Sequence, residues 1–207
     1  MVLVHGLWMT GLEMALLGGR LRRCGLTPYR FRYPSLRGTV AGNAARLHAF
    51  MEGIPEETLH LVGHSLGGLV IRRFLHDFPG QRPGRVVTLG TPHTGSEMAR
   101  RLRRGPLGTL LMGRGAEDGL LGGLPPWPHG RELGSIAGRL SLGVGWLIPG
   151  LPRPNDGTVA VAETRLEGMT DHVTVAASHM GLLVSREAAR QTCRFLGHGR
   201  FIRGNEG

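Results

Sequence analysis

The segment from Leu59 to Pro79 constrains the fold more than any other part of this sequence. Its apolar start, Leu59 to Val62, is typical of a short buried strand, and Gly63-His64-Ser65-Leu66-Gly67 follows directly. Apolar residues then recur at steps of three and four, as on one face of a helix: Leu66, Leu69, Val70, Phe74 and Phe78. The sequence therefore predicts a strand, a sharp turn at Ser65 and a helix that Pro79 ends.

The turn at Ser65 has the spacing of a nucleophile elbow, G-x-S-x-G. A strand-to-helix turn this tight needs small residues beside the serine, and it lifts the serine oxygen above the edge of the sheet. The amide of Leu66 would then lie at a helix N-terminus, where unpaired N–H groups favour an anion. We expect Ser65 to be a nucleophile. The alternative is a structural Gly-Ser-Gly turn, in a chain with 35 glycines.

The rest of the chain alternates strand patterns with helical ones. This order predicts right-handed crossovers and an α/β fold, with a mainly parallel sheet of about six strands flanked by helices on both faces. Ligands of such sheets bind beyond the carboxyl ends of the strands, where the loops after Val4, Val62 and Leu89 would open. The expected strands cover residues 2–4, 27–33, 58–62, 85–89, 134–142 and 171–176.

The length of 207 residues predicts one domain, 1–207, without a dividing linker. A lid-like insertion is expected at about 97–130. Within it, residues 105–130 are rich in Gly and Pro and carry apolar residues that include Leu111 and Trp127. Two interpretations stay open for this segment: a mobile cover with an apolar underside, or an ordinary packed loop with a short helix.

A serine nucleophile needs a base, and the base needs an orienting carboxylate. His179 follows the last predicted strand and precedes the last helix, at the expected edge of the sheet. Asp156 lies in an Asn-Asp-Gly turn after the preceding strand, and we favour it over Asp171 or Glu163. The predicted triad is Ser65, Asp156 and His179, in the chain order Ser, acid, His.

Two backbone amides should bind the developing oxyanion, those of Leu66 and Leu7. Leu7 follows His5-Gly6 in the loop after the first strand. We expect an apolar acyl pocket that includes Leu7, Trp8, Leu111 and Trp127. His64 is assigned to the same region, as a packing or hydrogen-bonding residue rather than a base.

The net charge is +10, and every basic residue except histidine is arginine. The densest group is Arg100, Arg101, Arg103 and Arg104. Its functional interpretation is weak attraction to an anionic or lipid surface; a solvated helix face is the alternative that we favour. Aromatic residues make up only 5% of the chain and none interleave with this run, so we predict no nucleic-acid partner.

Cys24 and Cys193 are the only cysteines, and neither lies in a C-x-x-C motif. We favour two buried free thiols over a disulfide between them, and we expect no metal site and no cofactor. Met1 is followed at once by the strand-like Val2-Leu3-Val4, and no apolar run reaches the length of a membrane span. The expected location is therefore cytoplasmic, and the oligomeric state stays unassigned.

Several motifs together give a family resemblance: Val4-His5-Gly6-Leu7, Gly63-His64-Ser65-Leu66-Gly67-Gly68, Gly90-Thr91-Pro92-His93-Thr94-Gly95-Ser96, Asn155-Asp156-Gly157-Thr158-Val159 and Ser178-His179. The chain resembles the α/β-hydrolase superfamily, and within it the small bacterial esterases and lipases and the GPI inositol-deacylase-like proteins. It starts at the oxyanion strand, without the leading antiparallel strands of the full fold, which resembles the minimal lipases.

The resemblance implies a serine esterase or lipase that cleaves a small-molecule or lipid ester through an acyl-enzyme. Ser65 would be the nucleophile, His179 the base and then the acid, and Asp156 the residue that orients His179. A thioesterase or amidase with the same triad is the first alternative, and a hydrolase-like binding protein without activity is the second.

Overall fold

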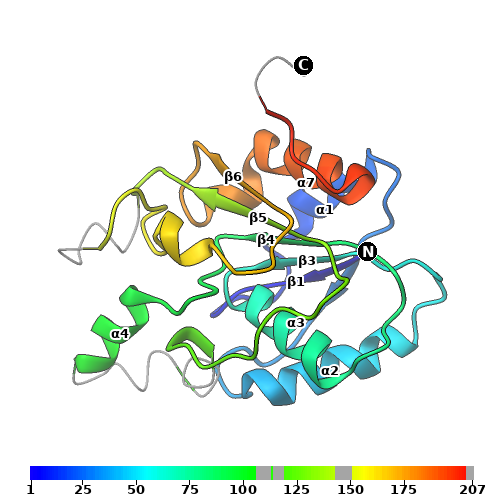
Figure 1. Cartoon of the computed structure of the whole chain (residues 1–207), viewed down its shortest axis with the longest axis horizontal. Coiled ribbons are helices and arrows are strands. Elements are labelled where there is room, and N and C mark those ends of the chain that lie inside the picture. Colours follow the sequence, from blue (N-terminus) through cyan, green and yellow to red (C-terminus); the bar gives the residue numbers. More distant parts are fainter. Residues whose placement is uncertain (106–112, 114–118, 143–150, 204–207) are drawn as a thin grey trace.

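The computed structural model describes residues 1–105, 113, 119–142 and 151–203. These residues form a six-stranded sheet in the order β2-β1-β3-β4-β5-β6, and every neighbouring pair is parallel (Figure 1). The predicted fold class is therefore confirmed. The strands are β1 Val2–Val4, β2 Tyr29–Phe31, β3 Leu61–His64, β4 Val86–Leu89, β5 Leu133–Gly138 and β6 Asp171–Val175.

Helices cover both faces of the sheet. In Figure 1, α2 and α3 lie on one side, whereas α1 and α7 lie on the other. The helices are α1 Ala15–Arg22, α2 Val40–Glu52, α3 Leu66–Asp77, α4 Glu97–Arg104, α6 Gly181–Val184 and α7 Arg186–His198, with a 3-10 turn, η3, at Val161–Thr164.

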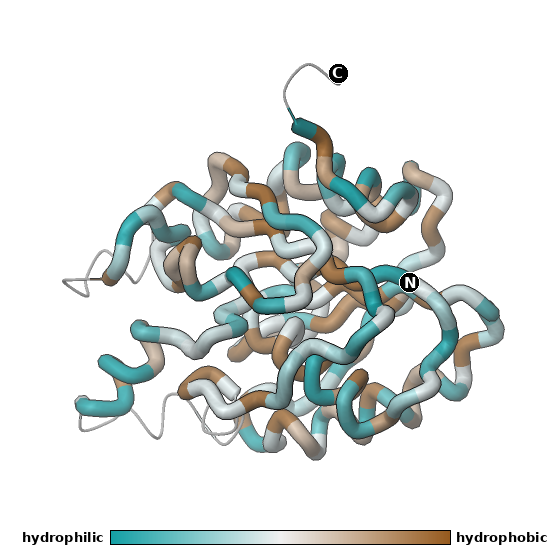
Figure 2. The backbone as a smooth tube through the Cα atoms, in the orientation of Figure 1, coloured by the Kyte–Doolittle hydropathy of each residue, from teal (hydrophilic) through white to brown (hydrophobic). Residues whose placement is uncertain are grey.

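The central strands are buried on both faces. Successive side chains of a strand point to opposite sides, so Val2 and Val4 join the core under α2 and α3, while Leu3 joins the core under α1 and α7. Figure 2 shows hydrophobic colouring gathered at the central strands, while the outer helices alternate hydrophobic and hydrophilic segments. Burial on both faces is what a parallel sheet with helical crossovers requires.

Side-chain caps fix where three helices begin. Thr39, Ser96 and Ser185 each accept a hydrogen bond from the backbone N–H three residues ahead, at 3.0, 3.2 and 3.1 Å. Each cap stabilises its helix by about 1 kcal/mol. Gly199, with φ +72°, ends α7 in the left-handed conformation.

Local contacts set the bounds of two elements. The first helix starts at Ala15, because the Glu13 carboxylate accepts from the Thr10 and Gly11 amides and holds the preceding stretch as a loop. The fifth strand ends at Gly138 rather than Leu142, where the Leu142 N–H bonds to the Leu140 carbonyl in a tight turn.

The prediction of two buried free thiols is wrong. Cys24, just after α1, and Cys193, in α7, form a disulfide across 169 residues of sequence. Helices α1 and α7 pack beside each other, and the Cα atoms of the two cysteines are 6.2 Å apart. Cys24 is exposed rather than buried. Among the described residues, no helix is long and apolar enough to cross a membrane.

Candidate active site

Ser65 occupies a strained turn between β3 and α3. Its φ of 52° and ψ of −122° lie outside the regions that L-residues prefer, and Trp8 is the only other described non-glycine residue with positive φ. Two hydrogen bonds hold the turn: the Ser65 N–H donates to the Leu89 carbonyl at 2.9 Å, and Thr91 Oγ1 donates to the Ser65 carbonyl at 2.9 Å. The sequence motif and the backbone thus agree at this residue.

Gly63 and Gly67 are required because backbone approaches them closely. A Cβ on Gly67 would lie 2.2 Å from the Val4 carbonyl oxygen, and one on Gly63 would lie 2.6 Å from the Gly68 nitrogen. The first contact lets α3 begin directly against the end of β1. The second lets the helix turn back tightly over its own strand.

His179 and Asp156 form a buried pair at the same edge of the sheet. His179 Nδ1 lies 2.7 Å from Asp156 Oδ2. The other carboxylate oxygen accepts from the amides of Thr158 and Val159 at 2.9 and 2.7 Å. Because a carboxylate only accepts, the histidine Nδ1 carries the proton and Nε2 is left to act as a base.

Backbone contacts fix this pair further. The His179 N–H donates to the Asp156 carbonyl at 2.8 Å, so the two loops are joined through main chain as well as side chain. Asp156 is 1% exposed and His179 is 9% exposed. A buried carboxylate held by three donors is suited to orienting a histidine and to stabilising its cation.

Ser65 and His179 line one cavity of about 340 Å³, whose walls are mostly apolar. Three predicted pocket residues, Leu7, Trp8 and His64, are among its lining residues. The others are Gly6, Met9, Pro92, Ser96, Met98, Ala99, Leu102, Leu120, Thr158, Val159 and Met180. The cavity could hold an acyl chain beside the serine.

The two predicted oxyanion amides lie at this edge. Leu66 is the first residue of α3, and Leu7 follows β1 in the neighbouring loop. The register pairs Val4 with Gly63, so both loops leave the sheet at the same level. Leu7 also lines the cavity. Two amides that bind one oxyanion must belong to loops at the same edge of the sheet, as these two do.

His64 contacts the backbone of the predicted base. Its Nε2 lies 3.1 Å from the His179 carbonyl oxygen, and the two rings are 4.7 Å apart between centroids. Burial lowers the pKa of His64 to about 3, so the ring is neutral and donates from Nε2. This hydrogen-bonding role agrees with the sequence interpretation.

A family model matches most of the chain. The model of the alpha/beta hydrolase family covers residues 1–199. The chain belongs to the α/β hydrolase family. Among curated proteins, none matches this sequence.

Solved structures share the hydrolase fold at low sequence identity. The mature form of lipase BlEst2 from Bacillus licheniformis superposes with a TM-score of 0.77 at 21% identity, covering 95% of this chain and 89% of that chain. The metagenomic carboxyl esterase MGS0156 gives 0.68 at 23%, covering 86% and 63%. Carboxylesterase CesB from Bacillus subtilis gives 0.59 at 16%, covering 96% and 83%.

One wall of this hydrolase cavity was missed by the sequence analysis. Met98, Ala99 and Leu102 of α4 line it, while the arginines of the same helix lie away from the core. The spacing of these three apolar residues is typical of one face of a helix, so the sequence does contain a signal for this wall. The four arginines are the more conspicuous pattern in the same segment, and they indicate the opposite face.

Trp127 does not lie in the cavity, which corrects that expectation. It is 6% exposed, packs on the core beside α3, and donates from Nε1 to the Arg131 carbonyl at 2.6 Å. The residues that follow it, Pro128 to Arg131, line a different cavity, where β3, β4 and β5 begin. Leu111, the other expected cover residue, lies outside the described residues.

The alternative acids and bases have other roles. Glu163 is buried and accepts from the amides of Glu97 and Ala160, so it holds the start of α4. Asp171 begins β6, at the edge away from Ser65, and accepts from the Phe201 amide. His93 Nε2 lies 3.1 Å from Thr88 Oγ1, a contact between the loop after β4 and that strand.

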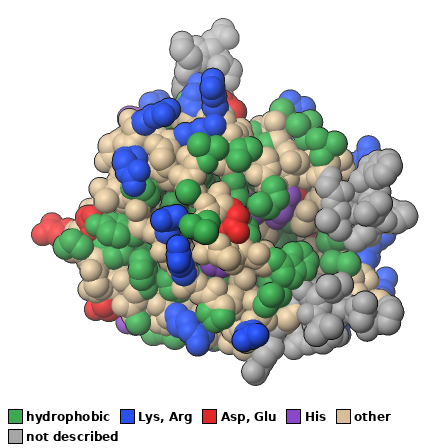
Figure 3. Space-filling model, turned by 180° about the vertical axis from the view of Figure 1, so that it is seen from behind, with side chains coloured by type: hydrophobic (Ala, Val, Ile, Leu, Met, Phe, Trp, Pro, Cys, Tyr) green, Lys and Arg blue, Asp and Glu red, His purple; other side chains and the backbone are tan. Residues whose placement is uncertain are grey.

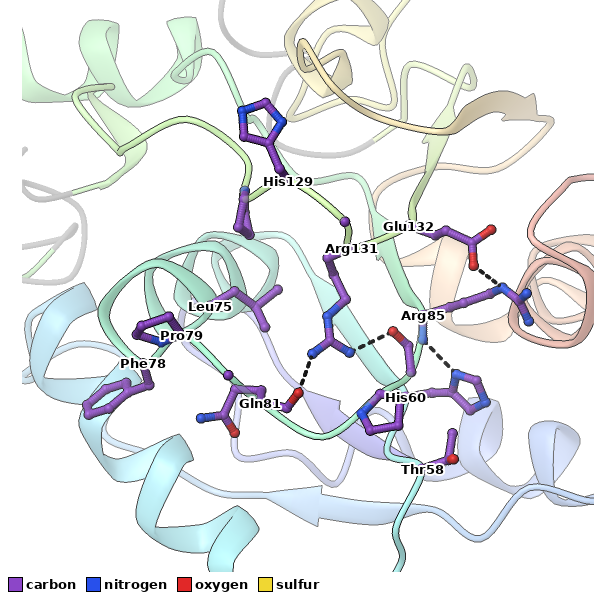
Figure 4. A pocket seen from close by; sticks show the side chains of 15 residues that line it. Thr58, His60, Leu75, Phe78, Pro79, Gln81, Arg85, His129, Arg131 and Glu132 are labelled. Carbon is purple, nitrogen blue, oxygen red and sulfur yellow. Dashed lines mark hydrogen bonds and ion pairs between the residues drawn. The ribbon is translucent and has the colours of Figure 1, made fainter.

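A larger cavity, about 640 Å³, lies at the opposite edge of the sheet, where β3, β4 and β5 begin. Figure 4 shows that the Arg131 side chain points to the chain near Gln81 and that Arg85 pairs with Glu132. Backbone carbonyls of Gly84 and Arg82 also accept from Arg131. These charged groups are occupied by structural contacts, so this cavity is a poor candidate for chemistry. Among the described residues, no cluster of side chains could hold a metal ion.

Proposed function

We propose that the protein is a carboxylic ester hydrolase of the esterase or lipase type, working through an acyl-enzyme on Ser65. The observation that carries the proposal is the buried His179–Asp156 pair at 2.7 Å, beside a serine in a strained turn, at an apolar cavity. Membership of a hydrolase family supports the same reaction class.

In the proposed first step, His179 Nε2 takes the proton from Ser65 Oγ as that oxygen attacks the ester carbonyl carbon. The negative charge on the carbonyl oxygen is stabilised by the amides of Leu66 and Leu7. The C–O bond to the alcohol breaks as His179 returns its proton to the leaving alkoxide. Asp156 stabilises the imidazolium throughout.

Water then enters and loses a proton to His179 as it attacks the acyl-enzyme. The ester bond to Ser65 breaks, the acid leaves, and the serine regains its proton. The described hydrogen bonds do not include one between Ser65 and His179, and such contacts commonly tighten only when substrate binds.

The cavity walls support an apolar acyl group. Met98 and Leu102 from α4 line the same cavity as Val159, from the loop that carries Asp156. Each buried methylene of an acyl chain would add up to about 0.8 kcal/mol of binding. We propose that α4, whose Met98, Ala99 and Leu102 line the cavity, covers part of this acyl pocket.

The disulfide is evidence about the cellular compartment in which the protein works. Such bonds persist in oxidising compartments and are rare in the cytosol. Since Cys24 and Cys193 are joined, we propose an oxidising compartment in place of the expected cytoplasmic location.

The experiment is a kinetic series of chromogenic esters of increasing acyl length, run beside matched acyl-thioesters and anilides. Wild type should cleave the esters fastest, and Ser65→Ala should lower kcat about 10⁴-fold or more with little change in melting temperature. Ser141→Ala, which removes a hydroxyl outside the cavity, is the matched control. If thioesters or anilides were cleaved faster than esters, the protein would be a thioesterase or an amidase instead. Full activity of Ser65→Ala would remove the proposed mechanism.

A further inference from the structure

A groove between α1 and α7 is lined by four arginines. Its volume is about 620 Å³, and it lies around the Cys24–Cys193 disulfide. Its lining includes the small residues Ala15, Gly19 and Ala189. Its basic walls come from both helices: Arg20 and Arg23 on one side, Arg186 and Arg190 on the other.

Most of this positive charge is not neutralised. Arg190 pairs with Glu187 at 2.9 Å, and Arg20 donates to the Val184 carbonyl, which carries no net charge. In the part of the chain that the structure describes, no hydrogen bond or ion pair involves the guanidinium group of Arg23 or Arg186. Four guanidinium groups with one carboxylate among them form a site for an anion with several oxygens.

Exposed apolar side chains continue from this groove to the mouth of the catalytic cavity. Leu16 lines the groove and is 50% exposed, and Val184, whose carbonyl Arg20 holds, is 54% exposed. Met180 and Trp8, 50% and 56% exposed, line the cavity itself. Helix α6 connects Met180 to Val184 and contacts α1.

The mixture of apolar and basic groups points to one kind of partner. Figure 3 shows apolar and basic side chains interspersed over the back of the molecule, with acidic ones sparse. A soluble anion would need only the arginines, whereas an anionic bilayer offers phosphates to the arginines and hydrocarbon to the apolar side chains.

We propose that the face formed by α1, α6 and the start of α7 docks on anionic lipid bilayers, with a lipid phosphate in the arginine groove. Leu16, Val184, Met180 and Trp8 enter the headgroup region. The mouth of the catalytic cavity then faces the membrane. The role of the cavity mouth rests on the proposed function, whereas binding to the bilayer does not require that the protein be an ester hydrolase.

The test is flotation of the full chain with vesicles of phosphatidylcholine alone or of phosphatidylcholine with one third phosphatidylglycerol. We expect binding to the anionic vesicles only, weakening as salt rises. Arg186→Gln/Arg190→Gln should lower the partition coefficient roughly 30-fold, the effect of two basic residues at an anionic surface. Leu16→Ser/Val184→Ser should weaken binding as well, because it removes apolar insertion.

The matched control is Arg103→Gln/Arg104→Gln, which removes the same charge from α4. The control should bind vesicles nearly as wild type does, and both arginine double variants should cleave a short soluble ester at the wild-type rate. Equal loss of binding in the two arginine variants would overturn the proposal, because net charge alone would then explain the binding.

Other outcomes separate the proposal from the proposed function. Hydrolysis of soluble esters without vesicle binding overturns the docking proposal and leaves the function standing. Vesicle binding by a chain without hydrolysis supports docking and contradicts the function. Equally strong binding to soluble polyglutamate would overturn the lipid assignment in favour of an acidic protein partner.

Discussion

Ser65 adopts a backbone conformation that costs about 1–3 kcal/mol for a residue with a side chain. The fold sustains this conformation because the positions two residues before and after Ser65 are glycines without a side chain. A Cβ at Gly63 or Gly67 would lie 2.6 or 2.2 Å from backbone atoms. The strain sets the serine at the tip of a turn between a buried strand and a buried helix. It is consistent with a reactive role for the residue.

His64 is expected to position the His179 loop. His64→Phe keeps a ring of similar size but removes the donor to the His179 carbonyl, leaving that oxygen unpaired. Loss of one such bond costs about 1–3 kcal/mol. We expect kcat for a short ester to fall about 10-fold or more with KM nearly unchanged, and His64→Gln to restore part of it. Steady-state kinetics of a variant that still melts near the wild-type temperature provide the check. An unchanged kcat would show that the contact does not matter.

Two buried histidines should make stability depend on pH. Burial lowers the pKa of His64 and of His93 to about 3 from the ordinary 6.5. Between these values the unfolded chain binds protons that the folded chain does not. The free energy of unfolding should therefore be highest above pH 6.5 and fall progressively towards pH 3.

Urea denaturation across this range gives the measurement. His93→Gln should flatten the dependence on pH, although it lowers stability at neutral pH. His198→Gln, at an exposed position on α7, is the control and should leave the slope as in wild type. A slope unchanged in His93→Gln would mean that His93 does not stay neutral in the folded protein.

At the scale of elements, the disulfide joins α1 to α7 and closes a long loop. Cys24→Ala/Cys193→Ala should lower the free energy of unfolding by about 2–5 kcal/mol. Activity on a short soluble ester should not change, because neither sulfur lines the catalytic cavity. Denaturant titrations of both proteins, with the intact mass before and after reduction, provide the measurement. Equal stabilities would indicate free thiols in solution.

Local signals made most elements predictable. Thr39, Ser96 and Ser185 indicate where their helices begin because their side chains cap the first turn. The G-x-S-x-G spacing indicates the turn at Ser65. Other boundaries depend on tertiary contacts. Glu13 holds the Thr10 loop open, and the Cys24–Cys193 bond depends on how two helices pack, which spacing along the chain does not reveal.

At the scale of the molecule, the parallel sheet brings distant loops together. The register pairs Val4 with Gly63 and His64 with Leu89, so the loops after β1, β3 and β4 leave at one edge. The loops that carry Asp156 and His179 join each other there through main chain. Chain order and strand pattern were enough to predict this gathering.

The residues that line the cavity were harder to predict than the position of Ser65, Asp156 and His179 at this edge of the sheet. Catalytic residue types are few and their order along the chain is informative, whereas apolar wall residues look like core. Met98 and Leu102 line the cavity only because Glu163 and Ser96 hold the start of α4 beside it. Trp127 has the composition of a cover residue but packs on the core.

The most direct measurement is mass spectrometry of the protein after treatment with a fluorophosphonate, which reacts only with an activated serine. We predict one adduct, on Ser65, and a labelling rate that falls steeply in His179→Ala and in Asp156→Asn. Loss of ester hydrolysis should parallel the labelling. An adduct on another residue, or hydrolysis that persists while Ser65 stays unlabelled, would contradict the proposed catalytic serine.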